Sequence, residues 1–301
     1  MKEKTREKKV DNPSQNGNRK TGRVEVAKTY KLYIGGQFPR TESGRYLAIS
    51  VGQNTTVNVC RASRKDFRNA VVAARSACKV WRSRSAYNRS QILYRMAEMV
   101  ETRKLQFIGD LQLQGMSDKA AHADVEAAID CIIHYAGWCD KYVQLFSTVN
   151  PVASSHFNFS VPEPMGVVGV LMDETAGLQA LVSAILPVLA GANTTVTLVH
   201  ISQVVVALDF AEVLQTSDLP AGVVNILTGK LEELLPHFSS HLDVNALIYL
   251  GDNQAQSMEM EKMGSEHILR VIRRDAAAAV EGPYPIMETQ EIKTTWHPIG
   301  K

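Results

Sequence analysis

The chain has 301 residues, of which 45% are hydrophobic and 21% are charged, a composition typical of folded globular proteins and unlike that of disordered or fibrous ones. Residues 1–31 carry ten Lys or Arg against four Asp or Glu, whereas the remainder is mildly acidic, which argues against a nucleic-acid-binding body. Residues 1–28 contain almost no large apolar side chain, so we expect a disordered basic tail. No apolar run is long enough for a membrane span, and none resembles a signal peptide, which favours a cytoplasmic protein without a membrane partner.

After the tail, residues 30–36 predict a strand that enters a Gly-Gly turn. Three helices are expected next. The first begins with a capping-box pattern from Ser63 to Asp66, the second covers about 87–103, and the third covers about 120–146. The four cysteines, Cys60, Cys78, Cys131 and Cys139, show no zinc-ligand spacing and no CxxC pair, so we interpret them as small buried side chains and expect no metal site.

The segment His156–Val161 alternates between polar and apolar residues, which predicts a strand covered on one side only, with Phe157, Phe159 and Val161 on one face. The segment Glu291–Pro298 alternates in the same way. Because it lies far from the other strands in sequence, it predicts a protruding β-arm rather than an internal strand.

Between these two segments, short apolar runs alternate with helical patterns, which predicts a parallel sheet covered on both faces. The expected fold class is therefore α/β with a Rossmann-like sheet. The predicted strands are 167–172, 194–199, 223–227 and 246–250, and the connecting helices cover about 178–190, 204–216 and 232–239.

Five segments carry a joint pattern: Glu163–Gly169, Pro187–Val196, Leu219–Gly229, Asp243–Gly251 and Lys293–Pro298. Taken together, they resemble the aldehyde dehydrogenase superfamily, over residues 29–275 and 286–298. The resemblance implies a cofactor-type α/β domain with a helical N-terminal part over 29–275, a linker in place of the catalytic domain over 276–285, and an oligomerisation strand over 286–301.

The residues that would contact a dinucleotide differ from the pattern of that family. Thr175 stands where the resemblance implies an oxyanion-stabilising Asn, and Leu198 and Ile201 replace the Lys and Glu that contact the adenosine ribose. Gly251 is kept, but Asp252 replaces a Ser at a helix N-terminus that would face the pyrophosphate. An Asp there repels phosphate and is better explained as a helix cap. We expect no cofactor, or weak NAD(P) binding.

The catalytic residues that the resemblance implies are also absent. Arg274 lies near the position of the general-base Glu, and the segment that would carry the nucleophilic Cys is replaced by about ten residues before Pro285. Acyl transfer through a thiolate needs an activated Cys, a base and oxyanion donors together. The sequence therefore predicts no catalytic residue and no aldehyde oxidation by this chain alone.

Three hypotheses for the function follow. The first is a pseudoenzyme that assembles with itself or with a full-length aldehyde dehydrogenase through its arm, unless the two arm strands only pair with each other. The second is a nucleotide sensor that uses Thr175, Gly229 and Gly251. The third is an NAD(P)-dependent oxidoreductase that is active only in a complex. The residues expected to form the oligomer contact are Phe157, Phe159, Val161, Ile292, Thr294 and Trp296.

Overall fold

A parallel β-sheet forms the centre of the molecule and confirms the predicted α/β class. The computed structural model describes residues 28–52, 55–173, 177–274 and 282–300. The sheet has the strand order β10-β9-β6-β7-β8, and every neighbouring pair is parallel. The four predicted strands are present, and β10 is an edge strand that was not predicted. The bounds are β6 (Val167–Met172), β7 (Thr194–Val199), β8 (Val224–Thr228), β9 (Ala246–Leu250) and β10 (Arg270–Arg274).

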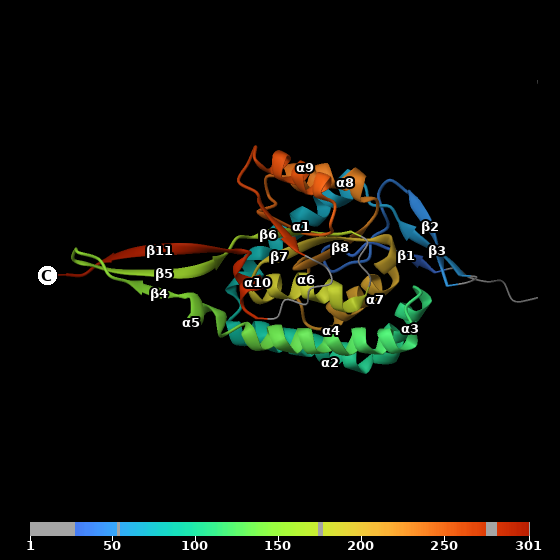
Figure 1. Cartoon of the computed structure of the whole chain (residues 1–301), viewed down its shortest axis with the longest axis horizontal. Coiled ribbons are helices and arrows are strands. Elements are labelled where there is room, and N and C mark those ends of the chain that lie inside the picture. Colours follow the sequence, from blue (N-terminus) through green and yellow to red (C-terminus); the bar gives the residue numbers. More distant parts are fainter. Residues whose placement is uncertain (1–27, 53–54, 174–176, 275–281, 301) are drawn as a thin grey trace, which may run out of the picture.

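Helices cover both faces of this sheet, so alternate residues of a strand pack into two separate apolar cores. On β6, Val167 and Leu171 join the core with the helices of one face, while Val168 and Val170 join the core of the other face. Figure 1 shows the two helical layers. The first layer holds α1 (Arg64–Ser83), α8 (Leu231–Ser240) and α9 (Gln254–Gly264), and the second holds α2 (Ala86–Thr102), α4 (Asp118–Trp138), α6 (Leu178–Ala190) and α7 (Val204–Thr216).

The start of the first helix agrees with its sequence, but the third predicted helix does not. Ser63 Oγ accepts a hydrogen bond from Asp66 N, and the Asp66 carboxylate accepts one from Ser63 N, which completes a capping box. The predicted helix 120–146 is instead divided into α4 and α5 (Tyr142–Phe146). Gly137 lies just before the break, and Lys141 Nζ donates to its carbonyl oxygen at 2.6 Å. The low helix propensity of glycine and this competing donor explain the interruption.

The N-terminal part contains elements that the sequence pattern did not predict. A small sheet has the order β1-β3-β2, formed by β1 (Thr29–Tyr30), β2 (Tyr46–Val51) and β3 (Thr55–Cys60). The helix α3 (Lys104–Leu113) follows α2. The strand expected over 30–36 is shorter than predicted, because the chain leaves β1 after Tyr30 and Tyr33 forms only an isolated bridge with Ile226.

The predicted arm is a three-stranded antiparallel sheet that projects from the body (Figure 1). It is formed by β4 (Thr148–Asn150), β5 (His156–Pro164) and β11 (Gln290–Pro298), with β5 in the middle. The strands β5 and β11 pair along their whole length, from Gln290 opposite Pro164 to Pro298 opposite His156. The outer edges of the arm belong to β4 and β11.

The chain returns from β10 to the arm through α10 (Tyr284–Met287). The predicted linker covers 276–285, and its residues 276–281 lie outside the described part of the chain. Of the described residues, Pro285 and Ile286 are buried in α10 against α6. This end of the linker is thus part of the packed fold. Within the described ranges, no helix is both long and apolar enough to cross a lipid bilayer.

Candidate functional site

Open parallel sheets bind ligands beyond the carboxyl ends of their strands. In this chain that edge carries Asp173 after β6, His200 after β7, Gly229 after β8 and Gly251 after β9. Gly229 and Gly251 therefore lie at the predicted edge, and the strands β6 and β7 lie between β8 and β9. Thr175 lies outside the described residues.

The end of β8 is closed by residues from the N-terminal part of the chain. Ala62 N donates to the Thr228 carbonyl oxygen at 2.8 Å, and Thr228 Oγ1 donates to the Cys60 carbonyl oxygen at 2.5 Å. A Cβ placed on Gly229 would lie 3.5 Å from both Ala62 N and Leu234 Cδ1. Gly229 thus packs against the chain itself.

The end of β9 is filled by a tyrosine. The buried side chain of Tyr249 lies against Gly251, where a Cβ would come within 2.5 Å of its ring. Its hydroxyl forms hydrogen bonds with Asp173 Oδ2 at 3.0 Å and Gln256 Oε1 at 2.7 Å. Burial, with the Asp173 carboxylate beside it, raises the pKa of Tyr249, so the hydroxyl stays protonated. Gly251 is therefore required by the close approach of Tyr249.

The N-terminus of α9 corresponds to the helix end that would face a pyrophosphate. Asn253 caps this helix by accepting a hydrogen bond from Gln256 N at 3.2 Å. The interpretation of Asp252 as the cap was wrong: Asp252 is exposed and precedes the cap. A helix N-terminus attracts phosphate through unpaired N–H groups. Here the cap uses one of them, and the carboxylates of Asp173 and Asp252 at this end of the sheet repel an anion. The residues do not fit a dinucleotide pyrophosphate.

At the end of β7, the two positions where the resemblance implies ribose contacts carry apolar side chains. Leu198 is buried in the core, and Ile201, which is 39% exposed, begins a 3-10 turn (Ile201–Gln203). The imidazole of His200 lies 2.8 Å from Ser202 Oγ and accepts from Ser202 N, so it caps this turn. Neither apolar side chain can form a hydrogen bond with a hydroxyl group.

The N-terminus of α6 is capped by a residue from another helix, which the sequence pattern did not predict. Asp124 of α4 accepts hydrogen bonds through Oδ2 from Leu178 N at 2.7 Å and from Gln179 N at 3.2 Å. Burial raises the pKa of Asp124, and the two backbone N–H groups oppose that rise. A Cβ on Gly177 would lie 2.2 Å from the same carboxylate. This helix end is thus satisfied by the chain's own carboxylate, and no local motif signals the pairing.

Arg274 occupies the position that the resemblance assigns to a general base. Its guanidinium forms an ion pair with Glu288 at 2.5 Å and donates to the Pro285 carbonyl oxygen at 3.1 Å. Only 10% of the Arg274 side chain is exposed. Nearby, Arg270 donates to the carbonyl oxygens of Glu288 and Gln290. Two arginines of β10 therefore hold residues 284–290, the return segment that leads to β11, against the body of the molecule.

The thiols show no arrangement that activates a nucleophile. No disulfide joins any of the four cysteines; Cys60 and Cys139 are buried as predicted, whereas Cys78 and Cys131 are only partly buried. Burial raises the pKa of Cys60, and it raises the pKa of Cys139 to about 12. Both shifts disfavour the thiolate, which is the reactive form of cysteine. Within the described residues, no group of three metal-binding side chains is close enough to hold an ion.

The predicted contact residues of the arm lie on both of its faces. Phe157, Phe159 and Val161 share one face, because alternate residues of a strand point the same way. Ile292, Thr294 and Trp296 of β11 pair with residues of β5 that point to the other face of the arm. These three side chains therefore lie on that other face. Asn158 and Ser160 are buried, whereas Phe157 is 44% exposed. Hydrogen bonds from Asn150 Nδ2 to Asn158 Oδ1 and Ser160 Oγ explain why polar residues can occupy the covered face.

Comparison with known proteins gives one consistent result. A family model described as "Aldehyde dehydrogenase family" matches residues 45–273. The chain is 28% identical to omega-crystallin of Enteroctopus dofleini over 80% of the chain and 49% of that protein. It is also 28% identical to retinal dehydrogenase 2 of Mus musculus over 83% of the chain and 49% of that protein. The chain thus spans about half the length of these curated relatives.

The solved structures agree on the fold. The NAD+ complex of aldehyde dehydrogenase from Bacillus cereus superposes with a TM-score of 0.77 at 23% identity, over 82% of this chain and 50% of that chain. A 3,6-anhydro-L-galactose dehydrogenase structure superposes with a TM-score of 0.76 at 21% identity. Because the family model matches well over half of the chain, this protein belongs to the aldehyde dehydrogenase family.

Proposed function

We propose that this chain is a non-catalytic member of the aldehyde dehydrogenase family and acts as a structural or regulatory subunit. It assembles through its arm, with itself or with a full-length aldehyde dehydrogenase, in the cytoplasm. The observation that carries the proposal is the ion pair of Arg274 with Glu288, because it places a cation where the family resemblance implies a proton acceptor and uses it to bind the chain's own return segment.

The proposal includes the absence of nucleotide binding. Tyr249 fills the space beside Gly251, Asn253 caps α9, and the carboxylates of Asp173 and Asp252 oppose phosphate. We expect isothermal titration calorimetry with NAD, NADH and ADP to give no binding at millimolar ligand. Binding of any of the three with a dissociation constant below 1 mM would instead support the nucleotide-sensor hypothesis.

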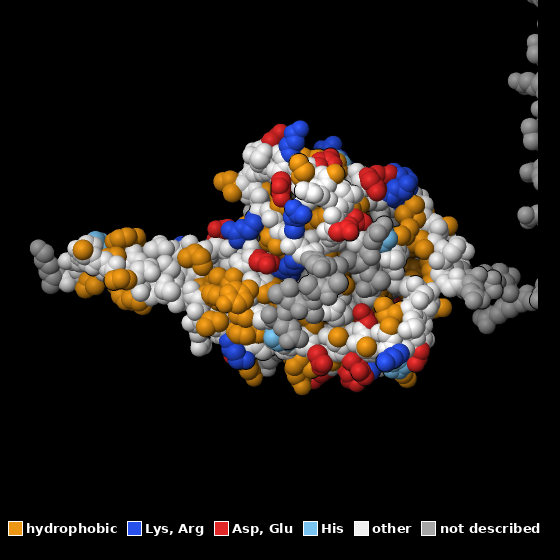
Figure 2. All heavy atoms as spheres, in the orientation of Figure 1, with side chains coloured by type: hydrophobic (Ala, Val, Ile, Leu, Met, Phe, Trp, Pro, Cys, Tyr) orange, Lys and Arg blue, Asp and Glu red, His pale blue; other side chains and the backbone are white. Residues whose placement is uncertain are grey.

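The proposal also requires a partner for the arm. Hydrophobic side chains gather along the projecting arm (Figure 2), among them Val149 at 68%, Ile292 at 54% and Trp296 at 58% exposure. The β4 and β11 edges offer unpaired backbone groups that can extend the sheet. Purification of a tagged chain from its own host, followed by native mass spectrometry, should give a complex of fixed stoichiometry. A monodisperse monomer that does not bind a full-length aldehyde dehydrogenase would overturn the proposal.

A pair of arm variants tests which face makes the contact. Phe157→Glu and Trp296→Glu place one charge on opposite faces of the arm, and we expect at least one of them to weaken assembly by roughly tenfold or more, as removal of a buried aromatic anchor does. Tyr87→Glu is the matched control, because Tyr87 is 70% exposed on the body. Sedimentation velocity gives the association constants. Equal association constants for all three variants would exclude both faces of the arm as the contact surface. The edges of β4 and β11 would then be the remaining contact surfaces.

Dehydrogenase turnover decides the remaining alternative, an NAD(P)-dependent oxidoreductase that is active only in a complex. The purified chain, alone and with its partner, should produce no NADH or NADPH beyond the turnover of the partner. Added turnover that is abolished by replacing a single cysteine of this chain would establish activity and contradict the proposal.

A further inference from the structure

A cavity of about 310 Å³ lies at the other end of the parallel sheet, beside the amino ends of β6 and β7. Cavities of this size fall at the lower end of the range for small-molecule sites. Three of its lining residues are cations on successive turns of α1: Arg75, Lys79 and Arg82. The remaining lining residues are Cys78, Pro164, Met165, Gly166 and Ala192, so no carboxylate of the described ranges lines the cavity.

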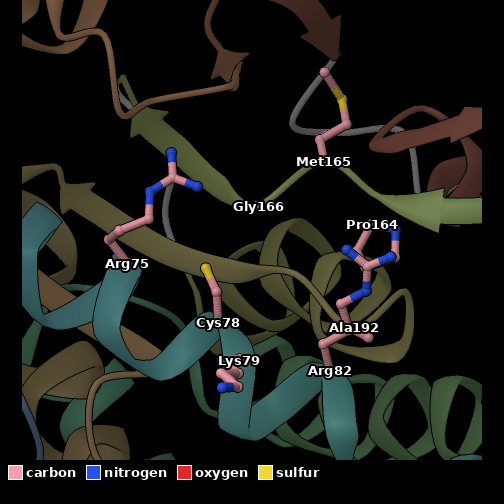
Figure 3. Close-up of a pocket in the computed structure, with 8 residues that line it drawn as sticks. All are labelled: Arg75, Cys78, Lys79, Arg82, Pro164, Met165, Gly166 and Ala192. Atoms are coloured by element: carbon pink, nitrogen blue, oxygen red, sulfur yellow. The ribbon is translucent and has the colours of Figure 1, made fainter.

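The two arginines are held in place by groups behind the cavity. Arg75 Nη2 donates to the Asp243 carbonyl oxygen at 2.6 Å and to Asn245 Oδ1 at 2.9 Å. Arg82 Nη2 forms an ion pair with Glu163 Oε2 at 2.7 Å. Figure 3 shows the two guanidinium groups on either side of Cys78. A guanidinium has five N–H donors in a fixed fork, so each arginine keeps donors for a ligand.

The charges near the cavity are not balanced. Asp243 forms an ion pair with Arg75, and Glu163 forms ion pairs with both Arg82 and Lys293. Lys79 is exposed and forms no ion pair with any described residue. Four cations against two carboxylates leave an excess of positive charge around a concave surface, which concentrates anions.

We propose that this cavity binds a small polyanion, a metabolite that carries phosphate or several carboxylates. Guanidinium groups recognise the planar pairs of oxygens on both kinds of anion. Arg75 and Arg82 bind the oxyanion groups from either side, and Lys79 supplies the unpaired charge. The site is separate from the cofactor edge of the sheet and does not depend on the proposed pseudoenzyme function.

Cys78 provides a direct readout, because its thiol lines the cavity and contacts Thr194 Oγ1 at 3.2 Å. The full chain is treated with N-ethylmaleimide, a neutral reagent, and the alkylation of each cysteine is followed by peptide mass mapping. We expect pyrophosphate or citrate to slow the alkylation of Cys78 by at least threefold relative to chloride at equal ionic strength, with no change at Cys131. A larger effect of pyrophosphate indicates a phosphate-bearing ligand, and a larger effect of citrate indicates a carboxylate ligand.

Lys79→Glu should abolish the protection and weaken binding in calorimetry by at least tenfold, with an unchanged melting temperature because the side chain is exposed. Lys119→Glu on α4 is the matched control, since it makes the same charge change at another exposed lysine. The proposal is overturned if neither anion protects Cys78 beyond chloride. It is equally overturned if protection is the same in the Lys79→Glu and Lys119→Glu variants.

Discussion

Replacing Arg274 with glutamate should lower the free energy of unfolding by about 2–4 kcal/mol and should not produce dehydrogenase activity. The change restores a carboxylate where the family resemblance implies a general base. It also removes the ion pair with Glu288 and leaves two carboxylates near each other, one of them in a position where only 10% of the side chain is exposed. The estimate is below that for a fully buried pair because Glu288 is 39% exposed. Chemical denaturation measures the stability.

A double-mutant cycle separates the ion pair from other effects of the substitution. Glu288→Arg alone should also destabilise the chain, whereas the combined Arg274→Glu and Glu288→Arg variant should recover part of the loss. Hydrogen exchange should report faster exchange in residues 284–290 of the Arg274→Glu variant, because that segment loses its anchor. Unchanged stability of this variant would mean that the return segment is held without Arg274.

Asp110→Asn should make the protein more stable at pH 8 and should flatten its stability between pH 4 and pH 8. Asp110 on α3 and Asp209 on α7 are both buried, at 8% and 3% exposure. Burial and the neighbouring Asp209 charge raise the pKa of Asp110 to about 7. Its Oδ2 atom has no hydrogen-bond partner among the described residues. Deprotonation therefore places an unsatisfied charge beside Asp209.

The direction of the pH dependence follows from this raised pKa. The unfolded chain releases the proton near pH 4, whereas the folded chain keeps it until about pH 7. The contribution of Asp110 to the free energy of unfolding is therefore largest below pH 4. It is lost, by on the order of 2–4 kcal/mol, as the pH rises through about 7. Unfolding curves at pH 4, 6 and 8 for the native and Asp110→Asn chains measure the difference.

Asp209→Asn is the control for this prediction. Asp209 accepts hydrogen bonds from Lys28 Nζ at 2.9 Å and from Gln106 Nε2 at 3.2 Å. Its replacement weakens both and also removes the Asp209 charge that raises the pKa of Asp110, so the stability of this variant should change less between pH 4 and pH 8 than that of the native chain. A native chain whose stability is the same at pH 5 and pH 8 would contradict the raised pKa of Asp110.

Local signals predicted much of the sheet and its helices. The runs at 167–172, 194–199 and 246–250 match β6, β7 and β9 residue for residue, because strands buried on both faces are continuously apolar. The capping pattern at Ser63 placed the start of α1 for a similarly local reason, since its donors and acceptors are three residues apart. The alternation of apolar runs with helical patterns predicted the α/β class, and the resemblance added the family.

Elements whose stability comes from distant contacts were not predicted. The edge strand β10 reads Arg-Val-Ile-Arg-Arg, and its residues Arg270 and Arg274 are explained only by carbonyl and carboxylate partners in the return segment. On the arm, the alternation at 156–161 located β5 as a strand covered on one side, but it did not decide which side is covered. The polar side of β5 is the covered one, and Asn150 Nδ2 of β4 donates to Asn158 Oδ1 and Ser160 Oγ there.

The sequence by itself determined the α/β class, the family and the departures at Asp252 and Arg274, because these depend on residue identity and on spacing along the chain. Only the tertiary structure decided what those residues do. It assigned the α9 cap to Asn253, paired Arg274 with Glu288, and brought Asp124 to the start of α6 across 54 positions. Hydrogen bonds and ion pairs between distant segments depend on how the elements pack, and no local pattern records that packing.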